Sequence, residues 1–110
     1  MDWKAGERRR SVLEAELEQI RRALPGLGVR RALLFGSLAR GGVRGQSDLD
    51  LIVIADSDEP FVARCGRFYA ALAPRIGLDL LVYTQTEFEA LKDRPFFRHA
   101  LRDAVVIYEA

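Results

Sequence analysis

Apolar residues recur at alternating intervals of four and three in the N-terminal part of the chain, at Leu13, Leu17, Ile20 and Leu24. This spacing gathers them on one face of a helix, so it predicts an amphipathic helix over residues 7–24. Pro25 and Gly26 follow the last of these positions and end the helix. We expect the apolar stripe to pack against the domain's own sheet, and a helix of a partner protein is the alternative.

Four short apolar runs further along the chain predict β-strands. They cover residues 29–35, 48–55, 78–83 and 104–108. The second run is apolar on both faces through its centre, which is typical of a strand in the middle of a sheet. The first two runs are joined by residues 36–47, a glycine-rich loop that could hold one helical turn at 37–40.

The later strands are separated by segments with helical patterns. Residues 60–75 are predicted to form a helix, Thr84 and Glu87 provide a capping box for a short helix, and residues 96–102 form another helical piece. A helical crossover requires the second and third strands to be parallel, whereas the short loop favours antiparallel pairing of the first two. The sequence therefore predicts a single α/β (α+β) domain over residues 1–110, with a small mixed β-sheet packed against helices.

Composition excludes several classes of protein. The chain of 110 residues has 17 Lys plus Arg against 16 Asp plus Glu, so it lacks the excess of a strongly basic nucleic-acid binder, and no direct nucleic-acid binding is predicted. Its one cysteine, Cys65, excludes an internal disulfide and the usual multi-cysteine zinc sites. No apolar run approaches the ~20 residues that cross a bilayer, and the N-terminus lacks an apolar signal core, so a cytoplasmic location is expected.

Three aspartates are candidates for chemistry. Asp48 and Asp50 are two positions apart at the head of the second strand, so both side chains point to one face, and Asp79 begins the neighbouring strand. Three converging carboxylates repel one another unless a positive group offsets their charge. Magnesium prefers carboxylate, water and phosphate oxygens, so it is the expected cofactor. The alternative is that Asp48 is a turn residue and that Asp50 pairs with an arginine.

The loop before these acids is suited to phosphate. Gly36 lets the backbone turn sharply and approach a ligand, and Ser37 offers a hydroxyl and a backbone N–H at the start of the helical turn. Arg40, and less strongly Arg44, could reach phosphate oxygens. Ser47 could bind phosphate too, or could cap the start of the second strand.

Together these residues resemble a known signature. Gly36-Ser37, ten intervening residues and then Asp48-x-Asp50 look like the motif of the polymerase-beta-type nucleotidyltransferases. The flanking Ala39-Arg40-Gly41 and Ser47-Asp48-Leu49-Asp50-Leu51 are similar to the minimal nucleotidyltransferase branch, and Asp79 lies where the family has a third carboxylate. The resemblance covers residues 29–110.

This resemblance implies a role for each matching position. Asp48 and Asp50 would bind two magnesium ions, and Asp79 would bind the catalytic one and help to deprotonate the acceptor. Gly36 and Ser37 would hold the triphosphate of ATP, the donor. In the minimal branch, the acceptor is often a tyrosine of a HEPN-domain ribonuclease, and the nucleotidyltransferase acts as its antitoxin in a toxin–antitoxin module.

The chain offers little room for an acceptor site of its own, because about thirty residues follow Asp79. The leading hypothesis is therefore a protein adenylyltransferase that takes a HEPN partner as its substrate. Two alternatives remain open. One is a non-catalytic nucleotide-binding module that neutralises the partner by contact, and the other is transfer to a small molecule of the aminoglycoside type, shared with a partner domain.

Overall fold

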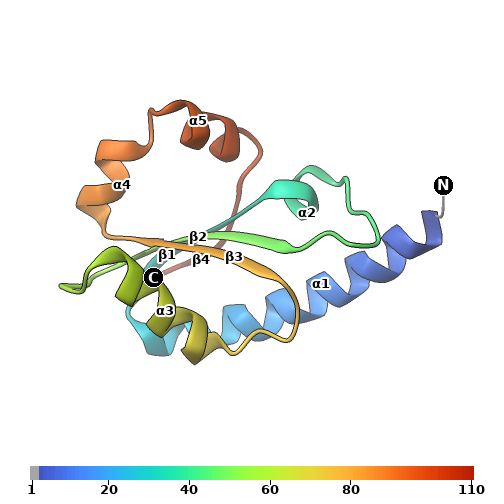
Figure 1. The fold of residues 1–110 in the computed structure, drawn as a ribbon, viewed down its shortest axis with the longest axis horizontal. Coiled ribbons are helices and arrows are strands. Elements are labelled where there is room, and N and C mark those ends of the chain that lie inside the picture. The colour runs from blue at the N-terminus through green and yellow to red at the C-terminus, as the bar shows by residue number, and fades with distance from the viewer. Residues whose placement is uncertain (1–2) are drawn as a thin grey trace.

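The computed structural model describes residues 3–110, which form a β-sheet covered by helices on both faces (Figure 1). In chain order, the elements are α1 (Trp3–Ala23), the 3-10 helix η1 (Leu24–Leu27), β1 (Val29–Phe35), α2 (Gly36–Arg40), β2 (Leu49–Ala55), α3 (Phe61–Leu72), β3 (Leu78–Tyr83), α4 (Gln85–Leu91), α5 (Pro95–Arg102) and β4 (Val105–Glu109). Among these described helices, none is both long enough and apolar enough to span a bilayer.

The sheet has four strands in the order β3-β2-β1-β4. Strand β1 pairs antiparallel with both β2 and β4, while β2 pairs parallel with β3. The predicted mixed sheet, the parallel crossover and the central position of β2 are thus confirmed. Asp50 is the one residue of β2 that is not fully buried, which marks the point where this apolar strand reaches the surface.

Two apolar cores lie on opposite faces of the sheet, because alternate residues of β2 point in opposite directions. Helices α1 and α3 cover one face, where Leu13 and Phe68 pack with Leu51 and Val53. Helices α4 and α5 cover the other, where Phe88 and Phe97 pack with Ile52 and Ile54. Figure 1 shows these helix pairs on either side of the strands. The apolar stripe of the N-terminal helix therefore packs on the domain's own sheet, as the spacing predicts.

Several predicted boundaries need correction. Helix α1 begins by residue 3 instead of residue 7, and Leu24, its predicted last residue, begins the 3-10 helix η1, in which Pro25 occupies an initial position. Helix α3 ends at Leu72 instead of Arg75, because Ala73 adopts a left-handed conformation with φ of 43° and a proline follows it. Strand β2 starts one residue after Asp48.

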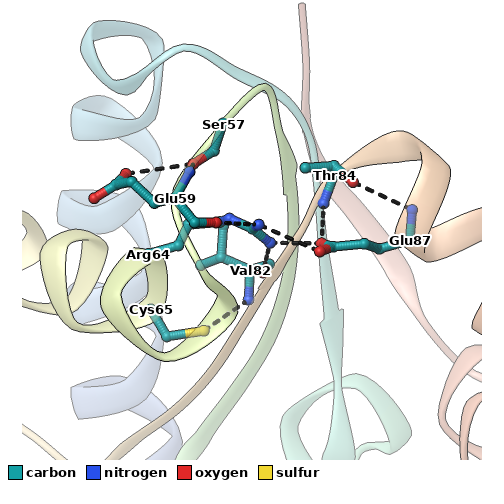
Figure 2. Close-up of polar contacts among 7 residues, drawn as sticks. All are labelled: Ser57, Glu59, Arg64, Cys65, Val82, Thr84 and Glu87. Atoms are coloured by element: carbon teal, nitrogen blue, oxygen red, sulfur yellow. Dashed lines mark hydrogen bonds and ion pairs between the residues drawn. The ribbon is translucent and has the colours of Figure 1, made fainter.

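A buried arginine joins α3 to β3 and α4 (Figure 2). Arg64 is 2% exposed and donates from Nη1 to the Val82 carbonyl at 3.0 Å and to the Glu87 carboxylate, and from Nη2 to the Glu59 carbonyl at 2.7 Å. The same Glu87 accepts from the backbone N–H of Thr84 at 2.8 Å, which confirms the predicted capping box. We name this set, Arg64, Glu87 and the groups that they contact, the arginine network.

Candidate active site

Strand register brings two of the predicted acids together. Asp50 and Asp79 are directly opposite each other in the parallel pair of β2 and β3. Both lie on the face that α4 and α5 cover, because their neighbours two positions along, Ile52 and Leu81, pack in that core. The two carboxyl groups are near enough for Asp79 to raise the pKa of Asp50.

The electrostatics of this pair reflect burial and like charge. Partial burial, followed by the hydrogen bond to Asp79 and the charges of Asp79 and Asp48, raises the pKa of Asp50 from 3.8 to about 6, while the charge of Arg40 opposes this shift. A carboxyl group with so high a pKa lacks a sufficient counter-charge. The repulsion is relieved by protonation of Asp50 only as pH falls through about 6.

Asp48 is held differently from the other two acids. It directly precedes β2 and is exposed, and a Cβ atom on Gly77 would overlap its carboxylate. Arg9 of helix α1 donates from Nη2 to the Asp48 carboxylate at 3.3 Å and from Nε to the Ser47 carbonyl at 2.7 Å. Sequence reasoning did not single out Arg9, because nothing in the local sequence indicates that α1 reaches this loop.

Gly36 makes room for the acid pair. It follows β1 directly, has a φ of 77°, and a Cβ atom there would overlap the Asp50 carboxylate. Position 36 therefore requires glycine for both backbone conformation and space. Ser37 follows in the first turn of α2, so the predicted Gly-Ser turn lies beside Asp50, which is opposite Phe35 in the sheet.

The remaining predicted binding residues differ in their positions. Arg40 is exposed at the end of α2, and its effect on the pKa of Asp50 places its charge within reach of the acids. Ser47 accepts a hydrogen bond at its hydroxyl from the backbone N–H of Arg44 at 2.9 Å, so this hydroxyl closes a turn of the loop.

A cleft of about 610 Å³ adjoins Asp50 and Asp79. Its volume is in the range of small-molecule sites. The rest of its lining is apolar, aromatic or small and comes from β1, α3, β3 and α5: Phe35, Cys65, Gly66, Tyr69, Leu78, Leu80, Leu81 and Phe96. Sequence reasoning missed Tyr69 and Phe96 as site residues, because their proximity to the acids depends on how α3 and α5 pack.

The donor set fits an oxygen-seeking cation only in part. Within residues 3–110, no three His, Cys, Asp or Glu side chains converge on one metal position. Asp50 and Asp79 are opposite each other in the sheet, whereas Asp48 is paired with Arg9. Adjacent carboxylates offer the oxygen ligands that magnesium prefers, and a bound cation would offset their repulsion. Asp48 lies near enough for its charge to raise the pKa of Asp50.

A comparison with known families identifies the family of this chain. The family described as "Polymerase beta, Nucleotidyltransferase" matches residues 18–110. The chain belongs to this family. The matched segment includes the Gly36-Ser37 turn and all three aspartates, so this is a nucleotidyltransferase-type domain.

A solved structure of a provisionally named nucleotidyltransferase from Sulfolobus solfataricus has the same fold. It aligns with a TM-score of 0.58 at 19% sequence identity, over 96% of this chain and 85% of that one. At this identity the likeness supports the fold alone. A comparison with curated proteins gave no match.

Proposed function

We propose that this chain transfers AMP from ATP to a hydroxyl group, with Asp48, Asp50 and Asp79 as the ligands of two magnesium ions. The observation that carries the proposal is the pairing of Asp50 with Asp79 beside the Gly36 turn, at the edge of a cleft. A like-charged pair in a partly buried position is costly to the fold unless it binds a cation. The family membership supports nucleotidyl transfer as the use of that cation.

Each residue then has a role that follows from its position. Gly36 lets phosphate groups approach the backbone next to Asp50, Ser37 donates to them, and Arg40 contributes positive charge. Asp79, at the rim of the cleft, accepts the proton of the acceptor hydroxyl. Bound magnesium supplies the positive charge that activates the attacking oxygen and stabilises the departing pyrophosphate.

A tyrosine of a HEPN-type ribonuclease is the proposed acceptor. The support comes from the motif that resembles the minimal branch and from the cleft, whose lining offers aromatic surface at Tyr69 and Phe96. A phenol ring can pack against such surface while its hydroxyl faces Asp50 and Asp79. Strand β3 is at one edge of the sheet, so the cleft is accessible to a side chain presented by another protein.

The test uses the chain and a HEPN-domain protein encoded beside it, incubated with ATP and magnesium and analysed by intact mass. An AMP adduct on a partner tyrosine, absent with Asp50→Asn, is the expected result. A partner that remains unmodified while Asp50→Asn still neutralises it would replace this proposal with neutralisation by contact. Labelling of an aminoglycoside instead of the partner would replace the proposed acceptor with a small molecule.

A further inference from the structure

Helix α1 reaches past the sheet to the loop that connects α2 with β2 (Figure 1). Its second half is anchored in the core through Leu13 and Ile20. Its first half lies against the loop, where a Cβ atom on Gly6 would come within 2.7 Å of the Val43 carbonyl oxygen. Arg10 donates to the Gly41 carbonyl at 3.1 Å, near the start of the same loop.

Arg9 is the residue of α1 that reaches the acids. Its guanidinium uses two nitrogens, one on the Ser47 carbonyl and one on the Asp48 carboxylate, so it holds both the backbone and the side chain at the end of the loop. The side chain of Arg9 is 22% exposed and that of Asp48 is 51% exposed. The pair is thus partly screened by water, and its strength is that of a surface ion pair.

We propose that Arg9 is a positioning residue and the counter-charge of Asp48, which a divalent cation must displace in order to use that carboxylate. The proposal rests on the proposed function, since it needs a cation at the acids. The guanidinium of Arg9 pairs with the Asp48 carboxylate, so a cation that binds there competes with it for that group. Helix α1 therefore sets the metal affinity of the site.

Neighbouring arginines of the same helix provide a matched control. Arg9 and Arg10 both contact the loop, but the contact of Arg10 is with a backbone carbonyl and that of Arg9 includes a carboxylate. Arg9→Gln removes the charge and keeps a donor for the Ser47 carbonyl. Arg9→Lys keeps the charge, and Arg10→Gln removes an equal charge from the adjacent position.

The experiment measures Mn²⁺ binding to the full chain without nucleotide, by electron paramagnetic resonance of the free ion, after thermal unfolding has shown that each variant folds. We expect Arg9→Gln to bind Mn²⁺ about two- to fivefold more tightly than the wild type, the scale of a surface ion pair. Arg9→Lys and Arg10→Gln should bind as the wild type does. The gain should shrink at 1 M salt, where the Debye length is only ~3 Å.

Equal or weaker Mn²⁺ binding by Arg9→Gln would overturn this inference and leave the proposed function intact. An equal gain in Arg10→Gln would also overturn it, because the effect would then come from net charge and not from the contact with Asp48. If the wild type and all variants fail to bind Mn²⁺, both the inference and the proposed function are wrong.

Discussion

Two clusters of charged side chains lie near opposite ends of strand β3. One cluster combines opposite charges, and the other combines like charges. The arginine network near the end of the strand combines Arg64 with Glu87, and Arg64 also donates to two backbone carbonyls (Figure 2). The acid cluster, which is Asp48, Asp50 and Asp79, combines groups of one sign near the start of β2 and β3. Opposite charges lower the pKa of Glu87 through its hydrogen bond to Arg64, whereas burial and like charge raise that of Asp50.

This contrast separates a cluster of opposite charges, which stabilises the fold, from a cluster of like charges, which is the proposed cation site. Both are partly buried and both involve β3, so burial and location do not distinguish them. The sign of the neighbouring charges does distinguish them, since Arg64 and Glu87 offset each other's charge, whereas Asp48, Asp50 and Asp79 repel one another. Substitutions in the two clusters should therefore change different properties of the protein.

The largest expected effect is on transfer activity. Asp50→Asn or Asp79→Asn should lower AMP transfer by about 10³-fold, on the scale of removing a group that stabilises transition-state charge. The free energy of unfolding of the metal-free protein should not fall, because each change removes like-charge repulsion. Labelled-nucleotide transfer and urea unfolding measure the two properties. Asp56→Asn is the control, because it changes an exposed carboxylate that is paired with Arg30. It should change transfer activity and the free energy of unfolding only slightly.

Substitutions in the arginine network should lower the stability of the fold and leave the transfer activity of the folded protein unchanged. Arg64→Met keeps the apolar volume of the side chain but leaves Glu87 and two carbonyls without their donor, so the free energy of unfolding should fall by about 2–4 kcal/mol. Activity per folded molecule should be retained. The matched control is Arg67→Met on the same helix, whose ion pair with Glu59 is exposed and contributes at most about 1 kcal/mol. Equal losses in the two variants, measured by urea unfolding, would contradict a special role for the buried pair.

Gly36 should be sensitive for steric reasons. Gly36→Ala places a methyl group against the Asp50 carboxylate at a φ of 77°, and strain of this kind costs about 1–3 kcal/mol. Nucleotide affinity should fall as well, because Asp50 has to move. Gly42→Ala changes a glycine of the same loop that has open space and no positive φ, so its unfolding curve should match that of the wild type.

The smallest expected effect is on the pH dependence of stability. The pKa of Asp50 is about 6 in the folded protein against 3.8 ordinarily, so its protonated form favours folding below pH 4 and this contribution is lost as pH rises through 6. After allowance for its partial exposure, the loss is on the order of 1–2 kcal/mol. Without metal, the advantage of Asp50→Asn over the wild type in urea unfolding should grow between pH 4 and pH 7.5. A constant difference over this interval would contradict the raised pKa.

Glu87 changes stability in the other direction. Its pKa is lowered in the folded protein, so its contribution is present above the ordinary value of 4.5 and is lost as pH falls through the folded value. Glu87→Gln should therefore remove a stabilising effect that is seen at neutral pH and disappears in acid. The two clusters thus predict pH dependences of opposite sign.

Local patterns were sufficient for much of this structure. Periodicity located the strands and the N-terminal helix, and the spacing of Gly36, Asp48 and Asp50 indicated the candidate site, because these signals arise within short stretches of chain. The end of α3 was predicted too late, since Ala73 gives no local sign of a left-handed conformation before Pro74.

Features that depend on tertiary packing were not predictable in this way. Arg9 meets Asp48 across 39 positions, and Arg64 meets Glu87 across 23. Several arginines on a helix are equally consistent with a solvent-exposed face. The packing of α1 and α3 therefore determines which of their arginines contacts a carboxylate. The cleft between Tyr69 and Phe96 has the same origin, because the two residues lie on helices that cover opposite faces of the sheet.

The most direct test of a cation-dependent nucleotide site at the acid cluster is calorimetric titration of ATP into the full chain, with magnesium and with EDTA. We predict that the wild type binds ATP at least tenfold more tightly with magnesium, an advantage on the order of 1.4 kcal/mol or more, and that Asp50→Asn loses this advantage. A cation-dependent nucleotide site at the acid cluster would be contradicted if the wild type bound ATP equally well with magnesium and with EDTA. It would also be contradicted if magnesium increased the ATP affinity of Asp50→Asn as much as that of the wild type.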